Sequence, residues 1–147
     1  MAAGLSIREE HLNDFRIAFE AVAQELLDAD ALVQTIATDG ELDTSEYSLA
    51  VARELQRQVW GQGFPEPLFE GDFHVSTQRV VGEKHLKLTL RLRSGIELLT
   101  HAETFDAIRF FSADPAPDNI HAVYSISINE YNGDESLQLI VRHWQED

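Results

Sequence analysis

The chain has 147 residues, of which 44% are hydrophobic and 25% charged, a composition typical of folded proteins. The absence of cysteine excludes disulfide frameworks, Cys-ligated metal centres and thiol nucleophiles. Eleven basic residues face 26 acidic ones, and this formal net charge of −15 argues, for the chain as a whole, against a nucleic-acid ligand. No apolar run approaches the roughly 20 residues that span a bilayer, and no leader precedes the first elements. We therefore expect a cytoplasmic protein that does not enter a membrane.

The first helix is predicted from an apolar stripe. Hydrophobic residues recur at spacings of three and four from Leu12 to Leu26. Ser6 and Glu9 have the spacing of a capping box, which predicts that the helix begins immediately after Ser6. The helix is expected to end within residues 27–30.

A short strand and a second helix are predicted next. Residues 32–38 alternate weakly and contain β-branched side chains, which favours a strand, and Asp39-Gly40 is a turn signal. The second helix is expected to begin at Asp43 or Thr44, with Glu46 placed for a cap, and to reach about residue 58.

The composition changes at residues 60–67, which hold two glycines, two prolines and two aromatic residues. Proline removes backbone donors and restricts the residue before it, so no helix or central strand is expected to cross this segment. We place a domain boundary here, between residues 59 and 60.

Five strands are predicted after the connector, because apolar and polar residues alternate with a period of two. Asn132-Gly133 between the last two is a hairpin signal. This number of strands in about 80 residues favours a small barrel of the oligonucleotide-binding (OB) type, although an SH3-like barrel fits the pattern almost as well. The fold class is therefore α+β. The predicted strands cover residues 69–76, 85–93, 104–111, 122–131 and 135–144.

The second strand carries the clearest functional pattern. Leucines occupy the even positions from 86 to 92, and side chains on a strand alternate between its faces. The opposite face therefore collects His85, Lys87, Thr89, Arg91 and Arg93. The window from residue 79 to 93 has a net charge of +4 within an acidic chain, as a groove for a single strand requires. The competing interpretation is an ordinary solvated strand face.

Other candidate residues are weaker. Trp60 and Phe64 either stack on bases or fix the connector to the core, and the second role is favoured. No histidine pair has metal-ligand spacing and no G-x-S-x-G motif is present, so the residues alone predict no active site. Three further aromatic residues are expected to pack in or around the core, and three scattered carboxylates are expected to be solvated surface charges. The aromatic residues are Tyr124, Tyr131 and Trp144, and the carboxylates are Asp106, Asp114 and Asp118.

Several segments together resemble the C-terminal part of the RecJ family, bacterial 5′→3′ exonucleases specific for single-stranded DNA that belong to the DHH/DHHA1 phosphoesterases. They occur in the family's order and spacing, and the resemblance covers essentially the whole chain. The segments are AAGLS (2–6), GQGFPEPLF (61–69), QRVVGEKHLK (78–87), NEYNG (129–133) and SLQ (136–138).

The resemblance implies a remnant of a DHHA1 α/β domain over residues 1–59, with two helices and short strands, and an OB-like antiparallel barrel over residues 60–147. The family's DHH domain, whose Asp and His residues bind manganese or magnesium, lies upstream, as does the Gly-Gly-His signature of DHHA1. The sequence therefore looks like a truncated product or an internal start. We expect no catalytic residue, metal ligand or cofactor in this chain itself.

The resemblance also implies a DNA-holding role for the barrel. Arg79, Lys84, His85 and Lys87 match motif positions, whereas Arg91 and Arg93 rest on the strand pattern alone. Expected partners are single-stranded DNA, the upstream DHH/DHHA1 region and the single-stranded-DNA-binding protein. The sequence departs from the family pattern at residues 134–135, which are Asp-Glu where family members often carry a basic residue. The alternative function is a stand-alone acidic module that binds a protein partner and no DNA.

Overall fold

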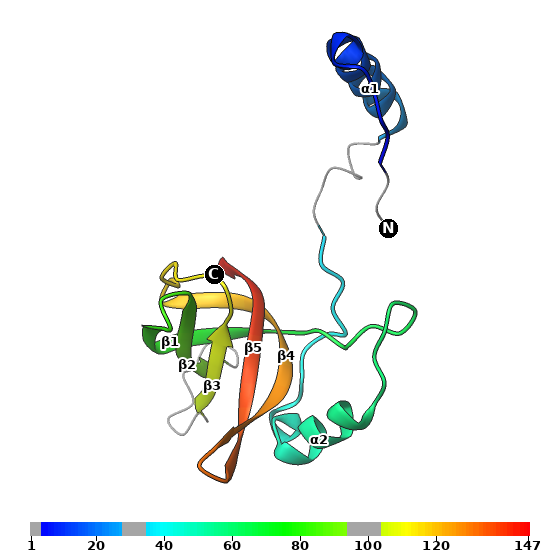
Figure 1. Ribbon diagram of the computed structural model, residues 1–147. Coiled ribbons are helices and arrows are strands. Elements are labelled where there is room, and N and C mark those ends of the chain that lie inside the picture. Colours follow the sequence, from blue (N-terminus) through cyan, green and yellow to red (C-terminus); the bar gives the residue numbers. More distant parts are fainter. Residues whose placement is uncertain (1–3, 28–34, 94–103) are drawn as a thin grey trace. The chain divides into compact units, whose positions relative to one another are not determined.

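The computed structural model describes residues 4–27, 35–93 and 104–147. The chain divides into two compact units, Met1–Ile36 and Ala37–Asp147, which are considered separately (Figure 1). None of the helices among the described residues is both long enough and apolar enough to cross a bilayer.

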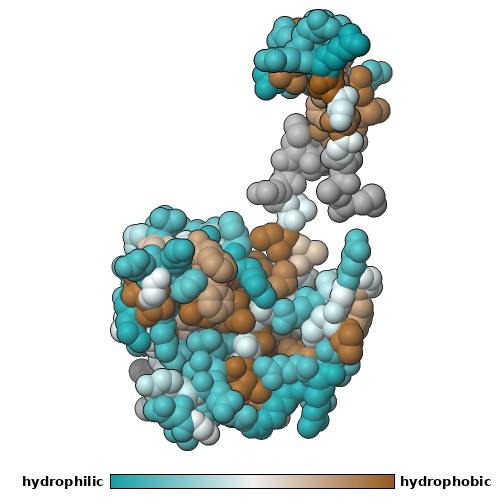
Figure 2. Space-filling view, viewed as in Figure 1, coloured by the Kyte–Doolittle hydropathy of each residue, from teal (hydrophilic) through white to brown (hydrophobic). Residues whose placement is uncertain are grey.

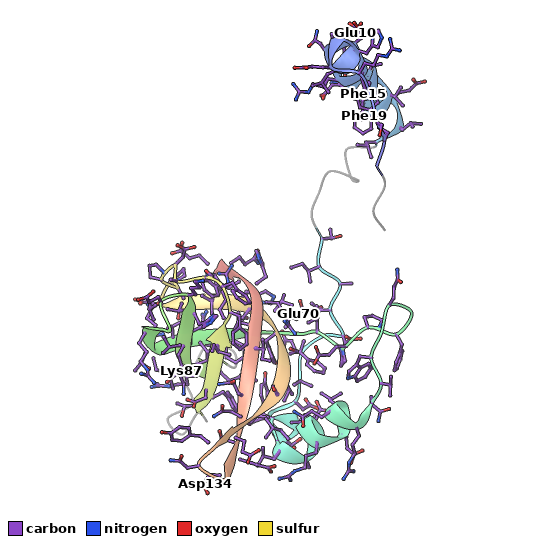
Figure 3. The ribbon with its side chains drawn as sticks, in the orientation of Figure 1. Glu10, Phe15, Phe19, Glu70, Lys87 and Asp134 are labelled. Carbon is purple, nitrogen blue, oxygen red and sulfur yellow. The ribbon has the colours of Figure 1, made fainter. Side chains whose placement is uncertain are left out.

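The first unit contains a 3₁₀ turn, Glu9–His11, that leads into helix α1, Leu12–Leu26. The capping box predicted at Ser6 is wrong: Arg8 precedes the 3₁₀ turn, and no side chain caps either element. The predicted apolar stripe is present, and Figure 2 shows hydrophilic and hydrophobic residues on different sides of α1. Phe15 and Phe19 contact each other on α1, with ring centroids 5.8 Å apart (Figure 3).

The short strand predicted over residues 32–38 does not form over residues 35–38. Residues 35–38 have no regular secondary structure, and residues 32–34 lie outside the described part of the chain. No turn is assigned at Asp39-Gly40, although Gly40 has the left-handed backbone that a turn glycine often adopts, with φ +95°. This segment joins the barrel, because the backbone carbonyl of Gly40 accepts a hydrogen bond from the backbone N–H of Glu70.

All five predicted strands form, and they close into a barrel with the order β1-β2-β3-β5-β4 (Figure 1). This Greek-key order is that of the OB barrel and decides against the SH3-like alternative. The barrel is not wholly antiparallel as predicted, because β3 and β5 pair in parallel. The strands are β1 (Phe69–Val81), β2 (His85–Leu92), β3 (Thr104–Arg109), β4 (Asn119–Tyr131) and β5 (Asp134–Glu146).

Alternate residues of β1, β2 and β3 fill the barrel, and residues 122–126 of β4 are all buried. Phe73, Leu88, Leu90, Ile120 and Leu139 are at most 1% exposed. The hairpin predicted at Asn132-Gly133 is confirmed: both residues have positive φ, as a two-residue hairpin turn of the I′ type requires.

The second predicted helix is split in two. Asp43 and Glu46 form the expected capping box around a 3₁₀ turn, Thr44–Glu46. The helix then stops at Tyr47, and Ser48 caps a new helix, α2 (Leu49–Arg57), by accepting a hydrogen bond from the backbone of Val51. The interruption lets Tyr47 enter the barrel, where it stacks on Phe105 with ring centroids 4.5 Å apart.

The boundary predicted between residues 59 and 60 falls inside the second unit, and the division lies instead before Ala37. The reason is packing: α2 contacts β4 and β5, and Ala52 of α2 is fully buried in the barrel's core. An ion pair between Arg53 and Glu135 also joins α2 to β5. The connector forms a tight turn, with Gly61 and Phe64 exchanging backbone hydrogen bonds.

Tyr47 and Tyr124 form a buried hydrogen bond of 2.5 Å between their hydroxyl groups. Burial raises the pKa of both Tyr47 and Tyr124, so the contact is one between neutral hydroxyls. Changing Tyr47 to Phe is expected to lower the free energy of unfolding by about 1–3 kcal/mol, because Tyr124 keeps a buried hydroxyl without a partner.

Urea denaturation of the variant against the parent chain measures this loss. The double variant Tyr47→Phe/Tyr124→Phe is the control and is expected to recover much of the stability, since neither hydroxyl then remains. A double variant whose loss equals the sum of the two single losses would contradict this account.

Candidate nucleic-acid interface

The alternation predicted for β2 is confirmed. Leu86, Leu88 and Leu90 are buried in the barrel, while His85, Lys87, Thr89 and Arg91 lie on the outer side and are half-buried. Figure 3 marks Lys87 on this strand. A row of polar and basic side chains therefore follows β2 on the outside of the barrel.

Strand β1 extends this row. Arg79 stands directly opposite Lys87 in the antiparallel pair, and Thr77 donates a hydrogen bond of 2.9 Å to Thr89. Lys84 is exposed in the turn that joins the two strands. The turn depends on left-handed backbone at Gly82 and Glu83, with φ of 58° and 63°.

Two of the predicted DNA-binding cations are neutralised by carboxylates. Lys87 Nζ lies 3.2 Å from Asp106 Oδ2 on β3, and the Arg93 guanidinium bonds the Asp147 carboxylate. The local charge of +4 is therefore reduced by acidic groups outside the window. Strand pairing brings Asp106 beside Lys87, because Asp106 stands opposite Thr89.

The remaining three predicted cations are less constrained. Arg79, Lys84 and Arg91 make no ion pair with any residue that the structure describes. Arg79 and Lys84 are exposed, whereas Arg91 is half-buried between His74 of β1 and Thr104 of β3. Arg79 and Lys84 are therefore the cations best placed to contact an anion in solution.

His85 holds the local structure at the end of β3. Its Nδ1 accepts a 3.1 Å hydrogen bond from the backbone N–H of Phe111, which leaves the proton of the neutral ring on Nε2. The rings of Phe110 and Phe111 meet the imidazole edge-on, each with centroids 5.2 Å away. His85 thus joins β2 to the residues that follow β3.

An acidic cluster lies elsewhere on the barrel, where β1 meets β4. His121 Nδ1 is 2.6 Å from Asp72, and Nε2 is 3.5 Å from Glu70. Hydrogen bonding to Asp72 raises the pKa of His121 above its usual value of 6.5. Partial burial lowers this pKa, whereas the negative charges of Asp72 and Glu70 raise it further. The two carboxylates approach opposite ring nitrogens, so the three groups do not converge on one metal position.

The raised pKa of His121 predicts pH-dependent stability. The protonated ring stabilises the folded state, and this contribution is complete below the unfolded-state pKa of about 6.5 and disappears as the pH rises through the higher folded-state pKa. We expect His121→Gln to destabilise the chain more at about pH 6 than at about pH 9. Urea denaturation of both proteins at the two pH values measures the difference, and a pH-independent loss contradicts it.

The expected packing role is confirmed for Trp60, Tyr124 and Trp144 but is wrong for Tyr131, which is 73% exposed. Trp60 donates a 2.9 Å hydrogen bond to the carbonyl of Leu55 at the end of α2, and Phe64 stacks on Trp60. These two rings line a cleft of about 430 Å³ with residues 37–39 and 65–68. Tyr124 is fully buried, and Trp144 packs under Arg109, whose guanidinium lies 3.9 Å from the ring centre.

The described residues do not fit a catalytic metal centre, because they contain no group of three or more His, Asp or Glu side chains arranged to hold an ion. The candidate carboxylate Asp106 is engaged with Lys87.

Comparison with known families decides the identity of the barrel. Residues 38–143 match the family model of the RecJ OB domain. The chain belongs to the RecJ OB domain family. The match begins close to Ala37, where the second compact unit starts.

Curated RecJ proteins match beyond the OB domain. The single-stranded-DNA-specific exonuclease RecJ of Haemophilus influenzae is 43% identical over 145 residues, covering 96% of this chain and 25% of its own length. The Escherichia coli RecJ is 40% identical over 148 residues, covering 96% and 24%. The chain thus spans about a quarter of the length of these relatives.

A solved structure supports the fold. The crystal structure of Thermus thermophilus RecJ in complex with Mn²⁺ superposes with a TM-score of 0.72 at 23% identity, covering 98% of this chain and 20% of that one.

Sequence reasoning missed several residues of the candidate interface. The partners Asp106 and Asp147 are far from the basic window in the chain, so no local pattern could reveal them. Phe110 and Phe111 did leave a signal, since two consecutive aromatic residues end the third predicted strand, whereas the observed β3 stops at Arg109. Of the acidic pair after the last hairpin turn, Glu135 bonds Arg53, whereas Asp134 lies at the hairpin tip (Figure 3).

Proposed function

We propose that this chain holds single-stranded DNA for a RecJ-type 5′→3′ exonuclease that acts in DNA repair and recombination. The observation that carries the proposal is the outer face of β1 and β2 in a RecJ OB barrel, where Arg79 and Lys84 are exposed without ion pairs among the described residues. In OB barrels oligonucleotides are received by the face of the second and third strands and by loops that include the one between the first and second strands, which here holds Lys84.

The acidic charge of the chain is compatible with this role because binding is local. At about 0.1 M ionic strength the Debye length is about 10 Å, so carboxylates farther away are largely screened from a phosphate bound on this face. Contact cations release condensed counterions from the strand, and this gain does not depend on distant charges. The acidic cluster at Asp72 and Glu70 would also repel a strand that left the basic row.

The hydrolysis itself is assigned to another part of the enzyme. We propose that this chain is not catalytic, and that manganese or magnesium is bound by an upstream DHH region. Residues before Ala37 are proposed to be part of the DHHA1 domain, reduced from the 59 residues expected from sequence. The exposed apolar residues of α1, including Phe19 and Leu26, support a packing partner in that region. Single-stranded-DNA-binding protein is a further proposed partner, and the cytoplasm the proposed location.

Fluorescence anisotropy with a labelled oligothymidylate tests the proposal. We expect weak binding that decreases with salt, with a slope of about −0.7 in log–log form for each phosphate contact. One barrel supplies only part of a multidomain grip, so binding is best measured at low ionic strength. Binding that is absent or independent of salt would favour the alternative, an acidic module that recruits a protein. Nucleotide release from 5′-labelled DNA in the presence of manganese would contradict the non-catalytic assignment.

A further inference from the structure

His85, Phe110 and Phe111 form an aromatic cluster at the end of the basic row. The imidazole contacts both phenyl rings edge-on, and the two phenyl rings also contact each other with centroids 6.4 Å apart. Phe110 is 44% exposed and Phe111 is 84% exposed. The cluster therefore presents large aromatic surfaces to solvent instead of contributing them to the barrel core.

The backbone of Phe111 is held in an unusual conformation. Its φ is +56°, in the left-handed region that bulky residues rarely adopt. The hydrogen bond from its N–H to His85 Nδ1 and the parallel bridge between His85 and Ser112 fix this turn to β2. Strained backbone of this kind persists where the surrounding structure enforces it, and it concentrates at binding sites. Core packing does not account for it here, because the side chain is exposed.

Cations flank the aromatic cluster. Lys84 precedes His85 in the chain, Lys87 follows it on the same face of β2, and Arg79 stands opposite Lys87 on β1. Ile108, two residues before Phe110, is opposite Lys87 on β3. The cluster and the cations thus occupy one continuous part of the outer barrel face.

We propose that nucleobases of single-stranded DNA stack on Phe110 and Phe111, while Arg79 and Lys84 contact the adjoining phosphates. The proposal rests on the proposed function and adds the residues that receive the bases. Single-strand sites combine a basic track with aromatic platforms, and stacking tolerates any sequence because every base has a π-face. His85 is a positioning residue, because it holds Phe111 through the backbone bond and does not itself face the base.

The test compares an oligothymidylate with an abasic oligonucleotide of equal length, which keeps the phosphates and lacks the bases. Anisotropy at low ionic strength is expected to show tighter binding of the oligothymidylate by the parent chain, by about fivefold or more. Phe111→Ala is expected to lose most of this preference while retaining the affinity for the abasic strand. Phe64→Ala is the matched control, since Phe64 is another exposed aromatic residue, located in the connector, and should leave the preference unchanged.

The other outcomes separate the two proposals. Salt-dependent binding of both oligonucleotides with equal affinity would overturn the stacking inference and leave the DNA-holding function standing. An unchanged preference in Phe111→Ala, with the same result for Phe110→Ala, would also overturn it. The absence of salt-dependent binding to either oligonucleotide would overturn both proposals. Circular dichroism of each variant confirms that the barrel is folded before its affinity is compared.

Discussion

A chain shortened to residues 60–147 is expected to lose cooperative folding, whereas one shortened to residues 37–147 is expected to keep it. The first lacks Tyr47, which is 8% exposed and stacks on Phe105, and Ala52, which is fully buried. It also lacks the apolar residues that pack against the core from the same segment, namely Leu42, Val51 and Leu55.

The expected loss in the free energy of unfolding is comparable to the whole stability of a small domain. Removal of one buried aromatic side chain costs about 3–5 kcal/mol, and the unpartnered hydroxyl of Tyr124 adds about 1–3 kcal/mol. Together with the removal of Ala52 and the apolar residues beside it, this approaches or exceeds the about 5–15 kcal/mol that stabilises a typical domain.

Urea denaturation followed by circular dichroism distinguishes the two shortened chains. Trp60 and Trp144 are present in both, so tryptophan fluorescence provides a second probe under identical conditions. Coincident, sigmoidal transitions are expected for residues 37–147, and a broad transition or none for residues 60–147. Equal midpoints for the two would show that α2 is dispensable and would restore the boundary at residue 60.

Reversal of two cations on the proposed interface is expected to weaken DNA binding strongly. In the variant Arg79→Glu/Lys84→Glu both exposed cations become carboxylates next to the path of the phosphates. The slope of log affinity against log salt is expected to fall by about 0.7 for each phosphate that the variant no longer binds. Neither residue forms an ion pair with the described residues, so little stability should be lost with them.

The matched control reverses two cations elsewhere. Arg8 and Arg57 are exposed, pair with Glu10 and Glu54, and lie outside the barrel strands. The variant Arg8→Glu/Arg57→Glu has the same net charge as the interface variant. It is expected to bind DNA nearly as well as the parent chain, because neither Arg8 nor Arg57 belongs to the basic row on β1 and β2. Equal losses in both variants would mean that net charge controls binding and that no localised site exists.

Strand β2 illustrates what a local pattern can reveal. Its alternation predicted both the buried leucines and the outward basic row, because the faces of a strand repeat every two residues regardless of what surrounds it. The capping box at Asp43 and Glu46 and the hairpin at Asn132-Gly133 were predicted for the same reason, since a few neighbouring residues form each of them. The capping box at Ser6 failed despite a similar pattern, because no hydrogen bond forms there.

The sequence by itself determined the five strands, the basic face of β2 and, through its motifs, the resemblance to RecJ. Three features depend on tertiary structure alone. Carboxylates distant in the chain pair with Lys87 and Arg93. Tyr47, which precedes the connector, packs in the barrel against Phe105, and His85 bonds the backbone of the exposed Phe111. The physical reason is distance along the chain. Alternation and turns depend on adjacent residues, whereas ion pairs and core packing join residues that only the closed barrel brings together. The charge of −15 excluded DNA only on average; the barrel leaves Arg79 and Lys84 as exposed, unpaired cations among the residues described.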